Sequence, residues 1–206
     1  MLILSFFLYW LLLMLVVSIH EFAHSWVAYR CGDTTPKLMG RLSLNPLVHI
    51  DPLATLLMPF FLFIITKGRF IFGAAKPVPI NHWLLRNPKR DIIWIGIAGP
   101  LANILLAFFI GLMIRFIPSQ SLLTIILNYL AVISLILGIF NLIPIPPLDG
   151  SRIVMGILPS RFSYLYARLE PYGIIIIMLI LWMGFAETII LPSLNIMVKL
   201  FGLMRI

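Results

Sequence analysis

The sequence contains little cysteine and little charge. Cys31 is the only cysteine among 206 residues, which excludes a disulfide framework and a thiolate cluster around a structural metal. Charged residues make up only 11% of the chain, whereas 62% are hydrophobic, and the mean hydropathy is +1.09. An ordinary soluble globule does not have this composition, and the several long apolar runs predict a multi-pass protein of a lipid bilayer.

Acidic residues are especially scarce, with seven Asp and Glu against fifteen Lys and Arg and a net charge of +8. A basic chain can bind nucleic acid, but these basic residues fall in short loops between apolar segments instead of along one face. They are typical of topology signals, and we expect no nucleic-acid partner. The sequence also lacks a cleavable secretory signal, because the first basic residue is Arg30 and no small-residue cleavage site follows Met1–Ile19.

Only four histidines are present, and two of them stand in one motif of the first apolar stretch, His20-Glu21-Phe22-Ala23-His24. Residues four apart lie on nearly the same face of a helix, so His20 and His24 can offer imidazole nitrogens to one metal ion. Glu21 is poorly placed as a ligand from the same turn but well placed to take a proton from a metal-bound water. The alternative is that these groups only hydrogen-bond neighbouring helices, but ionisable groups are costly at membrane depth, which favours a functional site.

We expect an all-α multi-pass membrane protein, a helical bundle that occupies residues 1–206 as a single domain. Asp51–Thr66 is apolar but short and contains two prolines, which predicts a re-entrant or interfacial segment instead of a full crossing. Thr34–Asn45 and Gly68–Ile80 alternate small, aromatic and β-branched residues, which predicts that they pair as a small β-sheet at the membrane surface. The remaining predicted segments are the spans Leu2–Tyr29, Asp91–Phe116, Leu122–Leu142 and Tyr172–Leu191, the surface segment Ser151–Pro171 and the amphipathic or partly inserted tail Pro192–Ile206.

A second informative stretch, Asn141–Gly150, follows the third predicted span. Its prolines end the helix and leave carbonyl groups unpaired, which is tolerated at membrane depth only inside protein or beside a cavity. If Asp51–Thr66 turns back, this stretch and the two histidines lie on the same side of the membrane. The same arrangement places nearly all basic loops on that side, which the positive-inside rule identifies as the cytoplasm, with the N-terminus outside.

Catalytic zinc usually takes three protein ligands and leaves one position for water, so a third ligand must come from elsewhere in the chain. Asp149 is favoured because it follows the broken helix end on the same side as the histidines. His49 and Asp51 also lie on that side and stay open as alternatives. The candidates are Asp33, His49, Asp51, Asp149, Glu170 and Glu187.

Three motifs together resemble those of a known family. The His20–His24 motif and Asn141–Gly150 resemble the paired signature of the site-2 protease family of intramembrane zinc metalloproteases. Gly99-Pro100-Leu101-Ala102-Asn103 is similar to the G-x-x-x-N element of that family, and the three motifs cover roughly Ser18–Arg152 in the family's order. The resemblance implies one zinc ion per chain with the ligands His20, His24 and Asp149, Glu21 as catalytic base, and Asn103 and Asn141 near the substrate backbone.

The expected activity is therefore zinc-dependent hydrolysis of a peptide bond within or near the transmembrane segment of a membrane-protein substrate, in a chain of the compact prokaryotic type without a PDZ or CBS domain. An extended substrate strand can add to the edge of the predicted sheet, and Asn103 and Asn141 can hold it or else hydrogen-bond neighbouring helices. Two other classes compete. A metal transporter would need ligands along a pathway, which the other spans do not offer, and a catalytically silent scaffold of the same fold would more commonly have lost Glu21 or a ligand.

Overall fold

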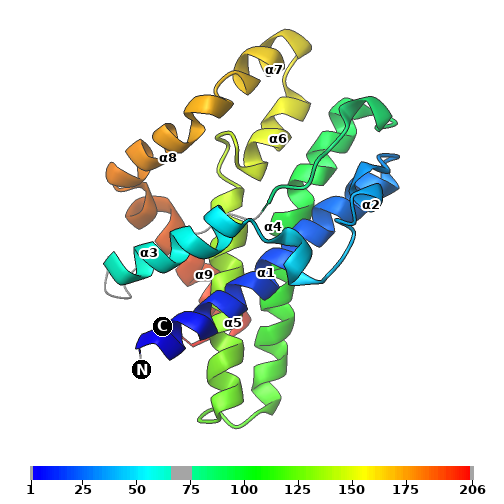
Figure 1. Ribbon diagram of the computed structural model, residues 1–206. Coiled ribbons are helices and arrows are strands. Elements are labelled where there is room, and N and C mark those ends of the chain that lie inside the picture. The colour runs from blue at the N-terminus through cyan, green and yellow to red at the C-terminus, as the bar shows by residue number, and fades with distance from the viewer. Residues whose placement is uncertain (1, 66–75, 205–206) are drawn as a thin grey trace.

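The computed structural model describes residues 2–65 and 76–204, and every regular element in that part of the chain is helical (Figure 1). The three long helices are α1 (Leu2–Arg30), α4 (Pro88–Met113) and α5 (Leu122–Asn141). The shorter helices are α2 (Thr35–Leu38), α3 (Met58–Ile65), α6 (Asp149–Ile157), α7 (Ser160–Ala167), α8 (Gly173–Trp182) and α9 (Leu191–Phe201). Single turns of 3-10 helix occupy Pro46–His49, His82–Leu84, Ile114–Phe116 and Glu170–Tyr172, and π-helix occupies Pro52–Leu57 and Ala186–Ile190.

Among the described residues, four helical stretches are long and apolar enough to cross a membrane: Phe6–Arg30, Pro88–Phe116, Leu122–Asn141 and Ser160–Trp182. The all-α multi-pass prediction is therefore confirmed. The last stretch begins earlier in the chain than the predicted span Tyr172–Leu191, because residues predicted to lie at the surface form α7. It also ends earlier, since Gly184 takes a φ of 86° just after α8 and turns the chain before Glu187.

Helix α4 lies at the centre of the bundle, where it packs against α1, α5 and α6 (Figure 1). Its buried face includes several small residues, which let neighbouring helices approach closely. That face comprises Ile92, Ile95, Gly96, Ala98, Gly99, Pro100, Asn103 and Ala107. The small residues of α4 thus allow α1, α5 and α6 to pack closely against it.

The C-terminal helix α9 completes the apolar core at the end of the bundle where α4 and α5 turn. Val198 and Phe201 of α9 are buried against Ile110 of α4 and Leu135 of α5 in one hydrophobic cluster. The tail that was predicted to be amphipathic therefore buries its apolar side against protein.

The chain breaks between α5 and α6 because Pro144, Pro146 and Pro147 cannot continue a helix. Gly150 stands where the chain folds back, and a Cβ on it would collide with the carbonyl oxygens of Leu142 and Ile143. Only a glycine permits this close approach. The break places the first residue of α6, Asp149, beside α1 and α4.

The predicted surface β-sheet is wrong for the residues that the structure describes. Its first half, Thr34–Asn45, begins with α2, since Pro36 near the start of the segment favours a helical turn, and then reverses direction at Gly40 with a φ of 68°. In its second half, residues 68–75 lie outside the described part, and residues 76–80 have no regular structure. The Lys76 amide donates to the carbonyl of His49 at 3.0 Å, and so approaches the 3-10 turn instead of Thr34–Asn45.

The predicted re-entrant segment Asp51–Thr66 forms one continuous helical stretch from Pro52 to Ile65. Fourteen helical residues span about 20 Å, which is less than the ~30 Å hydrocarbon core of a bilayer. The return of the chain would involve residues 66–75, which lie outside the described part. A turn back within the membrane therefore stays a prediction.

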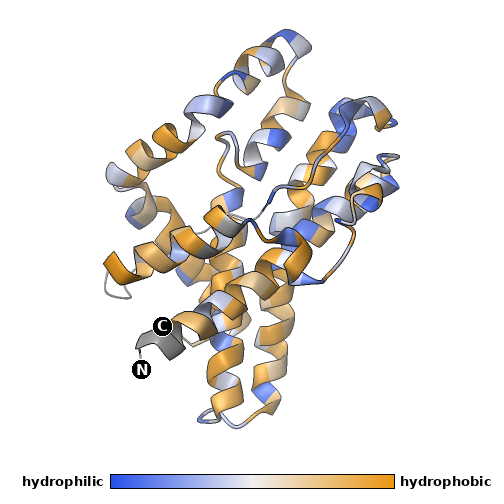
Figure 2. Cartoon of the chain, viewed as in Figure 1, coloured by the Kyte–Doolittle hydropathy of each residue, from blue (hydrophilic) through white to orange (hydrophobic). Residues whose placement is uncertain are grey.

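The two ends of segment 31–87 lie side by side. The Arg86 amide donates to the carbonyl of Cys31 at 3.0 Å, and the Asn81 amide donates to the carboxylate of Asp33 at 2.7 Å. Helix α1 therefore ends at the same end of the bundle where α4 begins (Figure 1). Figure 2 shows that hydrophilic residues gather at this end, whereas the opposite halves of α4 and α5 are mostly hydrophobic.

Candidate metal centre

The motif His20–His24 lies in the second half of α1, which contains no Gly or Pro between Leu2 and Arg30 and so runs unbroken through it. His20 and His24 are only 4% and 2% exposed, and their ring centroids are 4.6 Å apart. The helical spacing has thus placed two imidazoles next to each other inside the bundle, as the sequence predicts.

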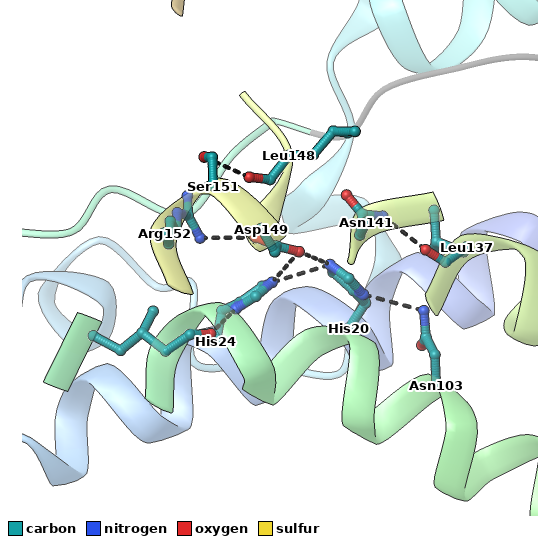
Figure 3. A network of polar contacts seen from close by, with 10 residues as sticks. His20, His24, Asn103, Leu137, Asn141, Leu148, Asp149, Ser151 and Arg152 are labelled. Carbon is teal, nitrogen blue, oxygen red and sulfur yellow. Dashed lines mark hydrogen bonds and ion pairs between the residues drawn. The ribbon is translucent and has the colours of Figure 1, made fainter. Parts of the chain in front are cut away.

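Asp149 reaches the two histidines from the start of α6 (Figure 3). Its Oδ2 atom lies 3.0 Å from Nε2 of His20 and 3.1 Å from Nε2 of His24, and the two Nε2 atoms are 3.0 Å apart. Three possible ligand atoms therefore form a nearly equilateral triangle in a buried position. In the part of the chain that the structure describes, this is the one group of His, Cys, Asp or Glu side chains that could hold a metal ion.

A second set of groups fixes the orientation of each of these side chains. His24 Nδ1 donates to the carbonyl oxygen of Ile95 at 2.6 Å, and the amide of Asn103 lies 3.1 Å from Nδ1 of His20 (Figure 3). Arg152 donates to Oδ1 of Asp149 at 3.1 Å, so the other carboxylate oxygen is left to face the histidines. Such outer contacts are typical of metal sites, where they orient the ligands.

Gly99 of α4 lies directly against the two imidazole rings. A Cβ at this position would collide with Nε2 of both His20 and His24. Because Gly99 has no side chain, there is room beside α4 for both imidazole rings and for a metal ion bound to them. The donor set also fits, since two imidazole nitrogens and one carboxylate oxygen are ligands that zinc accepts.

The charge of Asp149 suits a cation. Burial opposes ionisation of its carboxyl group, but the imidazoles of His24 and His20 that contact it outweigh burial and hold its pKa well below the usual 3.8. The group is therefore present as the carboxylate, which is the form that binds metal ions.

Glu21 stands beside the triangle and does not join it. Its side chain is half-buried, and no described residue forms a hydrogen bond or ion pair with it. A carboxylate next to the ligands but free of protein partners is what a general base for a metal-activated water requires.

Two of the other candidate ligands are occupied elsewhere. Asp33 is fully buried and accepts hydrogen bonds from the amides of Thr35 and Asn81, which makes it a turn-stabilising group. His49 is buried, and its Nε2 donates to the carbonyl of Ser43 at 2.8 Å. Asp51 accepts from the amide of Leu53 at 3.0 Å and is likewise outside the metal group, as are the exposed Glu170 and Glu187.

The two asparagines predicted to contact substrate differ in position. Asn103 is fully buried and faces His20, whereas Asn141 is half-buried and donates to the carbonyl of Leu137 at 2.9 Å (Figure 3). Asn141 keeps its carbonyl oxygen pointing away from α5. Contact of either residue with substrate stays a prediction.

Three features of this centre are missing from the sequence prediction. Arg152 was assigned to a surface segment, although its position three residues after Asp149 on a helix is a signal for an ion pair. Gly99 was noted only as part of a motif. The Ile95 carbonyl has no signal in the sequence, because any residue supplies the same backbone group.

Comparisons with known proteins agree with this geometry. The model of Peptidase family M50 matches residues 8–125 and 117–184. YwhC of Bacillus subtilis (strain 168), named as a candidate zinc metalloprotease, is 34% identical over 197 residues, which is 90% of this chain and 86% of YwhC. Rip2 of Mycobacterium tuberculosis (strain H37Rv), also named as a candidate zinc metalloprotease, is 32% identical over 76% of this chain and 53% of Rip2.

A more distant relative is zinc metalloprotease MJ0392 of Methanocaldococcus jannaschii, 30% identical over 75% of this chain and 35% of its own length. The chain thus spans most of YwhC but only about half of Rip2 and a third of MJ0392. No solved structure matches. The family match covers most of the sequence, and the chain belongs to peptidase family M50, the site-2 protease family, as a zinc metalloendopeptidase with several membrane-spanning helices.

Proposed function

We propose that this zinc protease cleaves its substrates inside the membrane, as an endopeptidase acting on the transmembrane segments of membrane proteins. One observation carries the proposal. The triangle of His20, His24 and Asp149 lies buried between helices that are themselves long and apolar enough to span a bilayer. A site in that position can reach a substrate helix in the bilayer.

In the proposed mechanism His20, His24 and Asp149 hold one zinc ion per chain. Zinc in a three-ligand site supplies an acidified water and a Lewis acid for the scissile carbonyl. Glu21 takes the proton of the attacking water and delivers it to the leaving amine, as a general base and then a general acid. Arg152 orients Asp149, because it occupies the carboxylate oxygen that faces away from the histidines.

A helical substrate hides its carbonyls in its own hydrogen bonds, so it must unwind locally before it is cut. Asn141 is the proposed contact for the unwound strand, because it is half-buried at the proline break and its carbonyl oxygen has no partner among the described residues. The predicted docking of a substrate to a sheet edge is not retained, since no sheet forms in the described part of the chain.

The proposed setting is the cell membrane, with the N-terminus outside, the site towards the cytoplasmic face and residues 1–206 acting as one metalloprotease domain. The contacts of Cys31 and Asp33 with residues 81–86 support one shared side for both loops. Basic residues gather on that side, and the opposite turn has Arg115. The expected partners are the lipid bilayer and a membrane-protein substrate, without nucleic acid.

Topology is tested with single cysteines placed in Gly32–Lys37 or Asn81–Lys89 in a Cys31→Ser background. Both should react with a membrane-impermeant maleimide in inverted vesicles and not in intact cells. Reaction of both in intact cells would reverse the orientation, and reaction from opposite sides would contradict the shared side.

The mechanism is tested by comparing Glu21→Gln with wild type. The detergent-purified variant should keep about one zinc ion per chain and lose about 10²- to 10⁴-fold in rate on single-span test proteins whose transmembrane helices contain a central Asn-Gly pair. Glu187→Gln, which alters an exposed carboxylate in Ala186–Ile190, is the matched control and should keep full activity. Near wild-type turnover by Glu21→Gln would contradict its role as the base. Cleavage sites are mapped by mass spectrometry, and cleavage only outside the transmembrane residues would contradict the intramembrane proposal.

A further inference from the structure

The two histidines of the metal centre differ in what holds their second ring nitrogen. His24 Nδ1 faces the backbone carbonyl of Ile95 at 2.6 Å, and a carbonyl can only accept a hydrogen bond. Nδ1 of His24 must therefore carry the hydrogen, which leaves the lone pair on Nε2. This imidazole is fixed by the backbone of α4 in the tautomer that binds a metal through Nε2.

His20 faces a group that can either donate or accept. Its Nδ1 lies 3.1 Å from Nδ2 of Asn103, and the fully buried Asn103 leaves its Oδ1 without any hydrogen-bond partner in the described part of the chain (Figure 3). With Nδ2 donating, Nδ1 of His20 is the acceptor and Nε2 carries the hydrogen, which it can donate to Oδ2 of Asp149 at 3.0 Å. With this tautomer, Nε2 of His20 offers no lone pair to an ion.

We propose that Asn103 is a positioning residue that sets the tautomer of His20 by turning its amide. A half turn about the bond between Cβ and Cγ brings Oδ1 to face Nδ1, so that Nδ1 carries the hydrogen and Nε2 becomes a ligand. With Oδ1 in that place, His20 is held in the tautomer that binds a metal through Nε2, which an apolar residue cannot do. This inference rests on the proposed ligand set and replaces the predicted contact of Asn103 with substrate.

The surroundings of Asn103 support a fixed position and an internal role. The hydroxyl of Ser134 on α5 donates to the backbone carbonyl of Asn103 at 2.9 Å. A Cβ on Gly138 would lie 3.3 Å from Cβ of Asn103, so α5 packs closely over this residue. The side chain has no exposed surface through which to touch a substrate strand, but its terminal amide needs only a rotation to change partner.

The test measures zinc affinity of detergent-purified protein without substrate, by competition with a chromogenic chelator. Asn103→Leu, which keeps the size but removes the acceptor, should bind zinc about 10- to 100-fold more weakly than wild type. Asn103→Asp, whose carboxylate can accept from Nδ1, should bind zinc at least as tightly as wild type. Asn128→Leu is the control, because Asn128 is also buried in a helix but pairs with the backbone of Met204, far from the site in sequence.

Wild-type zinc affinity in Asn103→Leu would overturn the proposal, and so would weaker binding in Asn103→Asp. If Asn103→Leu does not fold, the Asp variant alone decides by the same criterion. Unchanged zinc affinity in both variants, together with a raised KM in a separate cleavage assay, would instead indicate that Asn103 contacts the substrate. The zinc-affinity measurement uses no substrate. If neither wild type nor any variant cuts a membrane protein, the proposed cleavage is refuted, but the conclusion on Asn103 and zinc still holds.

Discussion

The packed helices α1, α4 and α5 and the C-terminal arm, defined as Ser160–Trp182 with α7 and α8, are all long and apolar enough to span a membrane but differ in surroundings. In each of the three packed spans 39% of the most apolar stretch is buried in protein, whereas in the arm the share is 6%. The arm extends to one side of the bundle (Figure 1). Sufficient length and hydropathy for a membrane span therefore do not establish that a helix is packed inside the protein.

Buried polar side chains mark the packed helices. The packed helices carry buried polar groups, such as Asn103, Asn128 and Ser134, each of which hydrogen-bonds a group on another element. Helix α8 consists of Ile, Leu, Met and Trp after its first residue, and such residues are as well solvated by lipid as by protein. One of these buried polar groups, Asn103, also belongs to the metal centre, through its contact with His20.

The largest effect that would test this contrast is expected for Asp149→Ala at the junction of the packed helices. Removing one of three ligands should lower both zinc content and activity, since coordination itself is lost. His49→Ala and Asp51→Ala should keep about one zinc ion per chain. Zinc stoichiometry is measured on the three purified variants, and loss of metal from His49→Ala or Asp51→Ala with retention in Asp149→Ala would replace the proposed ligand set.

A smaller but still marked effect is expected for Gly99→Ala, because the added methyl group displaces the imidazole rings. Overpacking of this kind costs about 1–3 kcal/mol in folding free energy, and zinc affinity should fall with it. Leu101→Ala, on an exposed position of the same helix, should leave zinc affinity unchanged. Equal zinc affinity in both variants would show that Gly99 does not shape the site.

The smallest effect is expected when zinc affinity is compared between two arginine variants, one beside the metal centre and one in the arm. Arg152→Ala should weaken zinc binding by up to about tenfold, because Asp149 keeps its contacts with both histidines when the guanidinium is lost. Arg161→Ala, in the exposed part of α7, should not change it. A comparable loss in both variants, measured by chelator competition, would indicate a nonspecific charge effect and weaken the contrast.

The parts of the site that follow from local spacing were predictable from sequence. His20 and His24 lie on one face because a helix repeats every 3.6 residues. Asp149 was favoured as the third ligand because it follows the proline break and is expected on the same side of the membrane as the histidines. The arrangement of Thr34–Asn45 was not predictable, because alternation of residue types does not name a partner strand, and Pro36 and Gly40 instead produce a helical turn and a reversal. The partner of Asn103 also required the fold, since only the packing of α1 on α4 brings it to His20.

The contact between α1 and α6 also has a consequence for the connectivity of the chain. His20 and Asp149 are 129 positions apart, so an ion shared by them closes a loop that contains most of the protein. In water a cross-link over such a loop would restrict the unfolded chain by about 5 kcal/mol, and less in a bilayer, where inserted spans are already confined. The single cysteine of this chain cannot form an internal disulfide. With the proposed ligand set, a bound metal ion would act as a removable cross-link and would stabilise the fold in addition to its catalytic role.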